Sequence, residues 1–125
     1  MRIVTLIARI LLGLMFLVFG LNGFLHFIPA PPPPGLAGQF VTVLVTSHYY
    51  YGVALVEVVG GALVLSGQFV PLGLTLLGPV LVNILLFHIS MAPAGLPLAL
   101  VATLLWFVVF YAVRNAFAGI FLQRA

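Results

Sequence analysis

The sequence contains no cysteine, no lysine and no aspartate, and its only acidic residue is Glu57. The absence of cysteine excludes a disulfide, a thiol redox pair, a cysteine-ligated iron–sulfur cluster and a cysteine nucleophile within this chain. Charged residues make up only 4% of the 125 positions, whereas a soluble domain usually carries about 25%. A chain with so little charge could not present a wetted surface, and we therefore expect an integral membrane protein.

The residues that are present are mainly apolar, with 65% hydrophobic side chains and a mean hydropathy of +1.39. Four stretches approach the ~20 residues that a membrane-spanning helix needs. They cover about residues 8–28, 50–66, 70–90 and 96–114. The sequence thus predicts an all-α fold, an integral membrane four-helix bundle that forms one membrane domain over residues 1–125 in contact with the lipid bilayer.

The four arginines lie near the two ends of the chain, Arg2 and Arg9 at one end and Arg114 and Arg124 at the other. An even number of spans places both ends on the same side of the membrane, and positive residues favour the cytoplasm. Both termini are therefore predicted to be cytoplasmic, with the arginines near anionic lipid head groups rather than nucleic acid. The first apolar run is longer than a signal-peptide core and lacks a small-x-small cleavage site, so we expect it to be a span.

The long segment after the first span has two parts. Residues 29–34, Pro-Ala-Pro-Pro-Pro-Pro, predict a stiff polyproline II spacer. Residues 36–47 are too few to span a membrane, but Leu36, Phe40 and Leu44 fall on one helical face. This pattern predicts a short amphipathic helix on the external surface. The tyrosines at 49–51 then mark the aqueous boundary where the second span begins.

Five polar residues lie in the predicted spans, and we interpret them as a buried polar cluster: Asn22, His26, Glu57, Asn83 and His88. Counted from the external ends at 1.5 Å per residue, the asparagines and the glutamate lie about 9–12 Å deep and the two histidines about 3 Å deep. A carboxylate at the centre of a membrane helix costs roughly 2–3 kcal/mol or more. Glu57 must therefore be protonated, paired or turned inward.

The relative positions of these residues support part of the cluster. Asn22 and His26 are four residues apart, which places them on one helical face. Glu57 shares its face with Ala54 and Gly61, small residues that allow neighbouring backbones to approach. His88 need not converge with Asn83, because five residues correspond to about 140° around a helix.

Structural interpretations remain open for each residue. Asparagines in membrane helices often form hydrogen bonds between helices, worth about 0.6–2 kcal/mol, without any chemistry. His26 and His88 could ligate haem as a pair, although nothing in the sequence fixes how they face. One carboxylate and two poorly aligned histidines fall short of a metal-ligand set, and no catalytic set is evident. We expect no metal, and His48 is interpreted as a surface residue.

Several motifs resemble those of the DoxX family of small bacterial membrane proteins. Residues 9–13, Arg-Ile-Leu-Leu-Gly, and residues 19–27, Phe-Gly-Leu-Asn-Gly-Phe-Leu-His-Phe, resemble its first helix. Residues 57–65, with the Glu-Val-Val-Gly-Gly sequence, and residues 68–73 resemble its second helix and turn. Residues 79–88 resemble the third helix, so the likeness covers most of the chain.

This resemblance implies a four-helix inner-membrane protein. Some relatives are associated with quinone-linked sulfur oxidation or with membrane assemblies that handle oxidative stress. Many relatives carry a lysine at the position of Gly23, and its absence removes a cationic partner for Glu57. The motif positions carried onto this chain are Arg9, Asn22, Glu57, Gly60, Gly61, Asn83 and His88.

Three functional hypotheses follow. The first is a non-catalytic subunit or scaffold of a redox or oxidative-stress-related membrane assembly, with a membrane or peripheral redox protein as its partner. The second is a quinone-handling oxidoreductase subunit in which Glu57 exchanges a proton, with His88 or His26 as the relay. The third is a transporter of protons or small solutes, although internal repeats are not evident.

Overall fold

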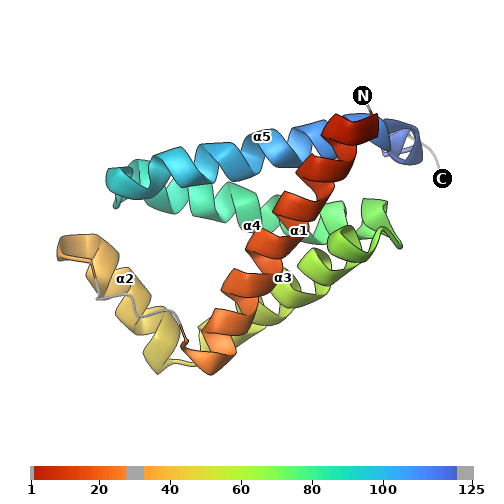
Figure 1. Ribbon diagram of the computed structural model, residues 1–125. Coiled ribbons are helices and arrows are strands. Elements are labelled where there is room, and N and C mark those ends of the chain that lie inside the picture. Colours follow the sequence, from red (N-terminus) through yellow and green to blue (C-terminus); the bar gives the residue numbers. More distant parts are fainter. Residues whose placement is uncertain (1, 28–32, 121–125) are drawn as a thin grey trace.

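The computed structural model describes residues 2–27 and 33–120. These residues form five α-helices and two short 3₁₀ helices, joined by turns (Figure 1). The long helices are α1 (Arg2–Leu25), α3 (Tyr49–Ser66), α4 (Val70–Ser90) and α5 (Leu96–Ala112), and α2 (Gly35–Thr46) is shorter. The 3₁₀ helices η1 (Pro93–Gly95) and η2 (Arg114–Phe117) flank α5. The predicted all-α fold is confirmed.

Four helices are long and apolar enough to cross a membrane, as the sequence predicted. The second and third spans agree with the predicted ranges to within one residue. The predicted range of the first span, 8–28, lies too far along the chain, because α1 begins at Arg2 and ends at Leu25. The last helix ends at Ala112 rather than at residue 114, because its final turn tightens into η2.

The short helix after the first span is also present. α2 covers Gly35–Thr46, close to the predicted 36–47, and Pro34 precedes it in an extended conformation with φ −74° and ψ 162°. Most of the predicted polyproline spacer, residues 29–32, lies outside the described residues. Phe40 and Leu44 line a cleft of the protein, whereas Leu36 remains exposed, so the predicted apolar face is only partly covered.

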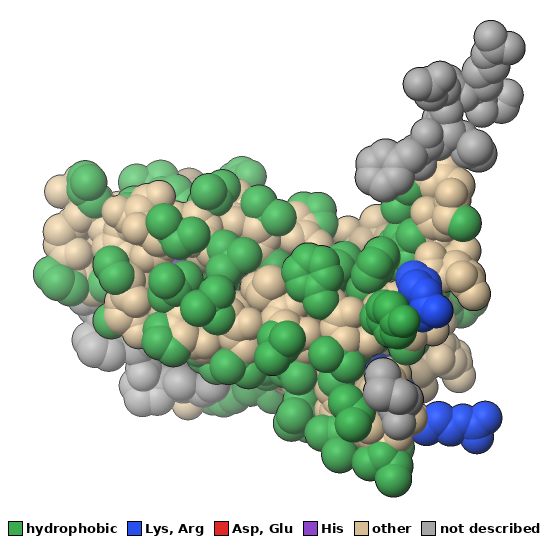
Figure 2. Space-filling model, turned by 90° about the horizontal axis from the view of Figure 1, so that it is seen from above, with side chains coloured by type: hydrophobic (Ala, Val, Ile, Leu, Met, Phe, Trp, Pro, Cys, Tyr) green, Lys and Arg blue, Asp and Glu red, His purple; other side chains and the backbone are tan. Residues whose placement is uncertain are grey.

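The helices alternate in direction, and this order separates two kinds of side chain. α1 ends just before His26, α3 begins just after His48, and His88 lies in the last turn of α4. We call this the histidine end. Arg2 and Arg9 start α1 and Arg114 follows α5, which defines the arginine end (Figure 1). Figure 2 shows arginines gathered at one end of a surface dominated by apolar side chains.

The tightly packed core lies in the arginine half of the molecule. Its fully buried side chains include Leu12, Val64, Leu74, Leu77 and Val109. Here α1 and α3 approach closely because glycines face the partner backbone. A β-carbon at Gly13 would lie 2.6 Å from the backbone nitrogen of Leu65, and one at Gly61 would lie 2.6 Å from that of Leu17.

A proline inside α4 lies close to a side-chain hydrogen bond between α4 and α5. Pro79 lies inside α4, where it cannot donate a backbone hydrogen bond and disturbs the preceding turn. The indole nitrogen of Trp106 donates a hydrogen bond to the carbonyl oxygen of Leu74 over 3.0 Å. This contact satisfies a carbonyl group next to the disturbed turn and fixes the register of the two helices.

Candidate functional site: a cleft with a buried carboxyl group

A cleft of about 960 Å³ occupies the histidine half, and all five α-helices contribute to its lining. α1 and α3 form one wall, and α4 and α5 form the other. Figure 1 shows α2 lying across the open side between these pairs. The volume is near the upper end of the ~300–1,000 Å³ typical of small-molecule sites, which are mostly apolar with a few polar groups. The cleft fits that description.

Glu57 is the most unusual residue in the cleft lining. Its side chain is only 5% exposed, and its Oε2 atom is buried without a hydrogen-bond partner among residues 2–27 and 33–120. Buried polar atoms in folded proteins are nearly always paired, because an unpaired one costs roughly 1–3 kcal/mol. The structure thus places an acid in a buried position that local packing alone does not explain.

Two predicted asparagines share the cleft with Glu57. Asn22 contributes from α1 and is half-buried. Asn83 contributes from α4 and is exposed rather than buried. Its Nδ2 atom donates a hydrogen bond to the carbonyl oxygen of Pro79 over 3.0 Å, within its own helix. This bond lies next to the carbonyl of Thr75, which the proline leaves without its usual donor.

His88 lines the cleft near its histidine end and has a defined orientation. Its Nδ1 atom lies 3.1 Å from the carbonyl oxygen of Ala92. A carbonyl oxygen only accepts, so Nδ1 carries the hydrogen in this bond and Nε2 of a neutral ring is an acceptor. Gly95 packs directly against the ring, and a β-carbon there would overlap it. His88 is therefore held rigidly at the rim.

The prediction for His26 requires a correction. His26 lies beyond the end of α1, is exposed, and adopts a left-handed conformation with φ 53°. Its backbone nitrogen donates to the carbonyl oxygen of Asn22 over 2.8 Å, which closes the helix. The two side chains therefore do not share a helical face. His26 lines a separate small cavity, so four of the five predicted residues share the cleft.

Aromatic side chains connect α2 with the opposite wall of the cleft. The rings of Phe40 on α2 and Phe87 on α4 have centroids 5.6 Å apart and are tilted by 33°. Both line the cleft, and aromatic pairs at such distances stabilise packing by about 0.5–1.5 kcal/mol beyond buried area. The short helix is therefore part of the site rather than only a surface element.

Tyr50, expected only at the aqueous boundary, also contributes to the cleft. Tyr50 begins α3, lines the cleft and also lines the small cavity beside His26. A signal was available, because Tyr50 precedes Glu57 by seven residues. Two helical turns place both side chains on the same face of α3.

The other ligand hypotheses can be compared with this geometry. Within the part of the chain that the structure describes, no group of three or more histidine, cysteine, aspartate or glutamate side chains could hold a metal ion. His26 and His88 line different cavities and so do not face each other across a common haem site. His48 is exposed, as expected, but its ring stacks on Tyr51 with centroids 5.6 Å apart.

Four apolar spans, a helix across their open side and a buried acid in a cleft define a multi-pass membrane protein with an internal site. The DoxX family model matches residues 4–90, from the first turn of α1 to the end of α4, and this chain belongs to the DoxX family. The match stops before α5. No curated protein and no solved structure matches the chain.

Proposed function

We propose that this protein binds a lipid-soluble molecule of the quinone class in the cleft, and that Glu57 exchanges a proton with the polar head of that molecule. The supporting observation is the buried Oε2 atom of Glu57, which lacks a partner among the described residues and belongs to a cleft with mostly apolar walls. A quinone combines a polar ring with an apolar chain, and it reaches such a site through the bilayer. Its oxygen atoms can accept hydrogen bonds from a protonated carboxyl or an amide.

Other polar groups of the cleft support this class of ligand. Asn22, Asn83 and His88 lie on helices that face α3 and could orient a ring from several sides. A fatty acyl chain alone would not require them, since a lipid tail offers no hydrogen-bonding atoms. Together they offer polar contacts to a ligand head with more than one polar atom.

Binding of decylubiquinone to the protein in lipid nanodiscs tests this proposal, with isothermal calorimetry as the readout. We expect Glu57→Gln to weaken the affinity by about tenfold or more, equivalent to roughly 1.4 kcal/mol. Asn115→Ala, an exposed substitution at the arginine end, is the matched control and should bind as the wild type does. Equal affinities for the wild type and Glu57→Gln would refute the role of the acid.

Chemical modification gives a second readout. Dicyclohexylcarbodiimide reacts with protonated carboxyl groups in apolar surroundings, and Glu57 is the only acidic side chain of the chain. We expect one adduct in the intact mass, absent in Glu57→Gln and suppressed by decylubiquinone. Modification that continues unchanged at saturating decylubiquinone would place the ligand elsewhere.

The cellular setting belongs to the same proposal. We infer that the protein lies in the bacterial inner membrane with its arginine end in the cytoplasm, because positive residues favour that side. Cysteine accessibility in an Ala118→Cys variant, which has no competing thiol, reports the side directly. Labelling of that residue from the periplasmic side would reverse the orientation.

A second candidate function is that of a non-catalytic subunit in a redox or oxidative-stress-related assembly. α5 is the least covered span, with 17% of its apolar window buried against 28% for the other three. Its exposed side chains Val101, Leu104 and Phe107, which do not line the cleft, could pack against a transmembrane helix of a partner. Gentle purification from native membranes should then retain a stoichiometric partner, and recovery of the chain alone would contradict this candidate.

A further inference from the structure

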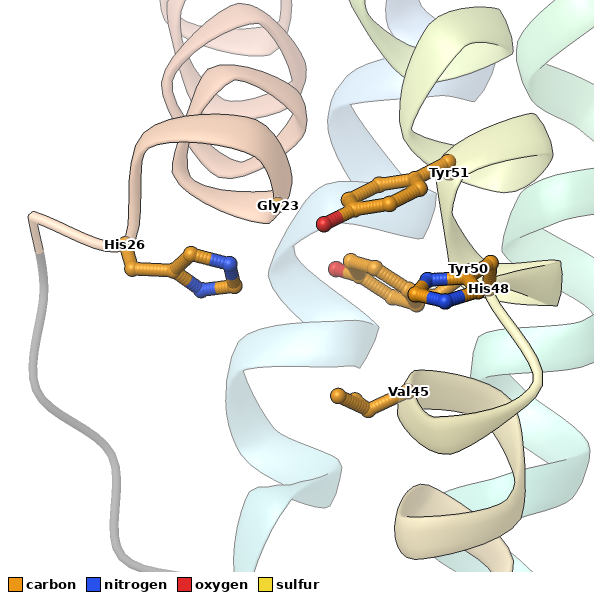
Figure 3. A pocket seen from close by; sticks show the side chains of 6 residues that line it. All are labelled: Gly23, His26, Val45, His48, Tyr50 and Tyr51. Carbon is orange, nitrogen blue, oxygen red and sulfur yellow. The ribbon is translucent and has the colours of Figure 1, made fainter.

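A second, much smaller cavity lies at the histidine end. Its volume is about 20 Å³, and it is lined by Gly23, His26, Val45, His48, Tyr50 and Tyr51 (Figure 3). We call it the histidine cavity. A space of at least about 10–15 Å³ with several polar partners is enough for one water molecule. Figure 3 shows the hydroxyl groups of Tyr50 and Tyr51 pointing toward the imidazole of His26.

The three consecutive tyrosines at the start of α3 differ in which of the two spaces they line. Tyr49 lines only the cleft, Tyr51 lines only the histidine cavity, and Tyr50 lines both. Tyr50 is held in this position by α1, because a β-carbon at Gly23 would lie 2.6 Å from its Cε1 atom. The phenol ring of Tyr50 therefore forms the partition between the cleft and the cavity.

Tyr50 and Glu57 also stand in a defined relationship along α3. They share one face two turns apart, a separation of about 10.5 Å along the helix axis. Both residues line the cleft, whose volume is large enough to hold several water molecules. His26 at the far side of the histidine cavity is exposed, so this series of polar groups ends in the aqueous phase.

We propose that Tyr50 relays protons between Glu57 and the water at the histidine end, with His26 as the outermost acceptor. The proposal rests on the proposed function in taking Glu57 as the proton-exchanging group. The Glu57 carboxyl releases a proton to water in the cleft, and the Tyr50 oxygen accepts one from that water. The same hydroxyl gives its original proton to the water of the histidine cavity, which passes one to His26. Tyr50 is unchanged after its O–H bond rotates, and no electron moves.

The competing route runs through His88, whose imidazole lines the cleft. The remaining titratable groups of the two spaces are Tyr49 in the cleft, and His48 and Tyr51 in the histidine cavity. The ring of His48 stacks on that of Tyr51, which in turn stacks on Phe24 with centroids 5.4 Å apart. Variants at Tyr49, Tyr51 and His88 therefore separate the proposed route from its alternatives.

Hydrogen–deuterium exchange of the Glu57 carboxyl tests the relay without any quinone. The carbonyl stretching band of the protonated acid can be assigned by its loss in Glu57→Gln, since the chain has no other acidic side chain. Protein in nanodiscs is transferred from H₂O to D₂O at a pH where the band is present, and the isotope shift is followed by infrared spectroscopy. Tyr50→Phe keeps the ring that packs on Gly23, so the fold should persist, and unchanged thermal unfolding would verify this.

We expect Tyr50→Phe to slow the exchange about tenfold or more, and His26→Gln to slow it in the same direction. Tyr49→Phe and Tyr51→Phe, each confined to one of the two spaces, should exchange at the wild-type rate, as should His88→Gln. Wild-type exchange in Tyr50→Phe, or slowing by His88→Gln alone, would overturn the proposal. A failure of decylubiquinone to bind would remove the proposed ligand but leave the exchange result standing, so the two proposals fail separately.

Discussion

The guanidinium group of Arg9 on α1 caps the C-terminal end of α3 through Val64. Its Nη1 atom donates hydrogen bonds to the carbonyl oxygen of Val64 over 2.8 Å and to that of Leu65 over 2.7 Å. The last carbonyl groups of a helix have no partner within the helix, and a positive charge there is favourable. Gly67 ends α3 in a left-handed conformation with φ 76°, which leaves space for the guanidinium group.

This cap predicts a stability loss when the guanidinium is removed. Arg9→Met should lower the free energy of unfolding by roughly 2–3 kcal/mol, the range for hydrogen bonds to charged groups. Thermal unfolding in detergent, followed by the fluorescence of the single tryptophan, measures the effect. Arg9→Lys keeps the charge but not the paired geometry, and we expect an intermediate value. An unchanged transition in Arg9→Met would show that the cap contributes nothing.

The close approach of α1 and α3 gives a prediction with a matched control on one helix. A β-carbon at Gly61 would lie 2.6 Å from the backbone nitrogen of Leu17, and backbone atoms cannot move aside without separating the helices. Gly61→Ala should therefore destabilise the protein by about 1–3 kcal/mol. Gly52 faces open space, so Gly52→Ala should be neutral or stabilising by up to about 1 kcal/mol. Equal effects would contradict the steric argument.

The contact between Trp106 and Leu74 predicts a smaller loss. Trp106→Phe removes the indole donor 3.0 Å from the Leu74 carbonyl but can keep the stacking on Phe110, whose ring lies 5.3 Å away. We expect a loss of about 1–2 kcal/mol, from one hydrogen bond and a carbonyl group without its partner. Circular dichroism during heating is the measurement, because the variant contains no tryptophan. An unfolding transition at the wild-type temperature would show that this hydrogen bond does not stabilise the packing of α5 on α4.

The ring contact between Phe40 and Phe87 predicts that α2 controls how long a ligand stays. Phe40→Ala should increase the dissociation rate of decylubiquinone, because the short helix loses its aromatic contact across the cleft, which is worth about 0.5–1.5 kcal/mol. Leu36→Ala on the same helix is the control, since Leu36 is 69% exposed and does not line the cleft. Identical dissociation rates in the wild type and Phe40→Ala would show that α2 does not retain the ligand.

Hydropathy was enough to predict the four spans, because the bilayer sets the length of an apolar helix. The short helix was predicted from the helical spacing of Leu36, Phe40 and Leu44. The end of α1 could not be placed this way. Phe27 and Ile28 continue the apolar run, but the left-handed backbone of His26 ends the helix at Leu25. Pro29 was the available signal, since helices usually end before a proline.

The site was predicted only in part, for a related physical reason. Charged and amide side chains are costly in hydrocarbon, so Asn22, Glu57 and Asn83 stood out among apolar neighbours. The apolar lining of the cleft gave no such signal, because side chains that face lipid and side chains that face a lipid-soluble ligand are equally hydrophobic. The side-chain type of Tyr50 gave no separate signal for the cleft either, since an amphipathic ring suits both a membrane interface and an internal site.

Replacement of Glu57 by an apolar residue of similar size separates a functional acid from a structural one. If Glu57 is retained for binding, its buried Oε2 atom costs stability, and Glu57→Met should raise the free energy of unfolding by about 1–3 kcal/mol while abolishing decylubiquinone binding. Asn83→Leu is the control within the cleft. The Asn83 amide already donates to Pro79, so its removal should bring no gain in stability. A lower unfolding temperature in Glu57→Met would instead mean that the acid holds the helices together, and the cleft would need another anchor for its ligand.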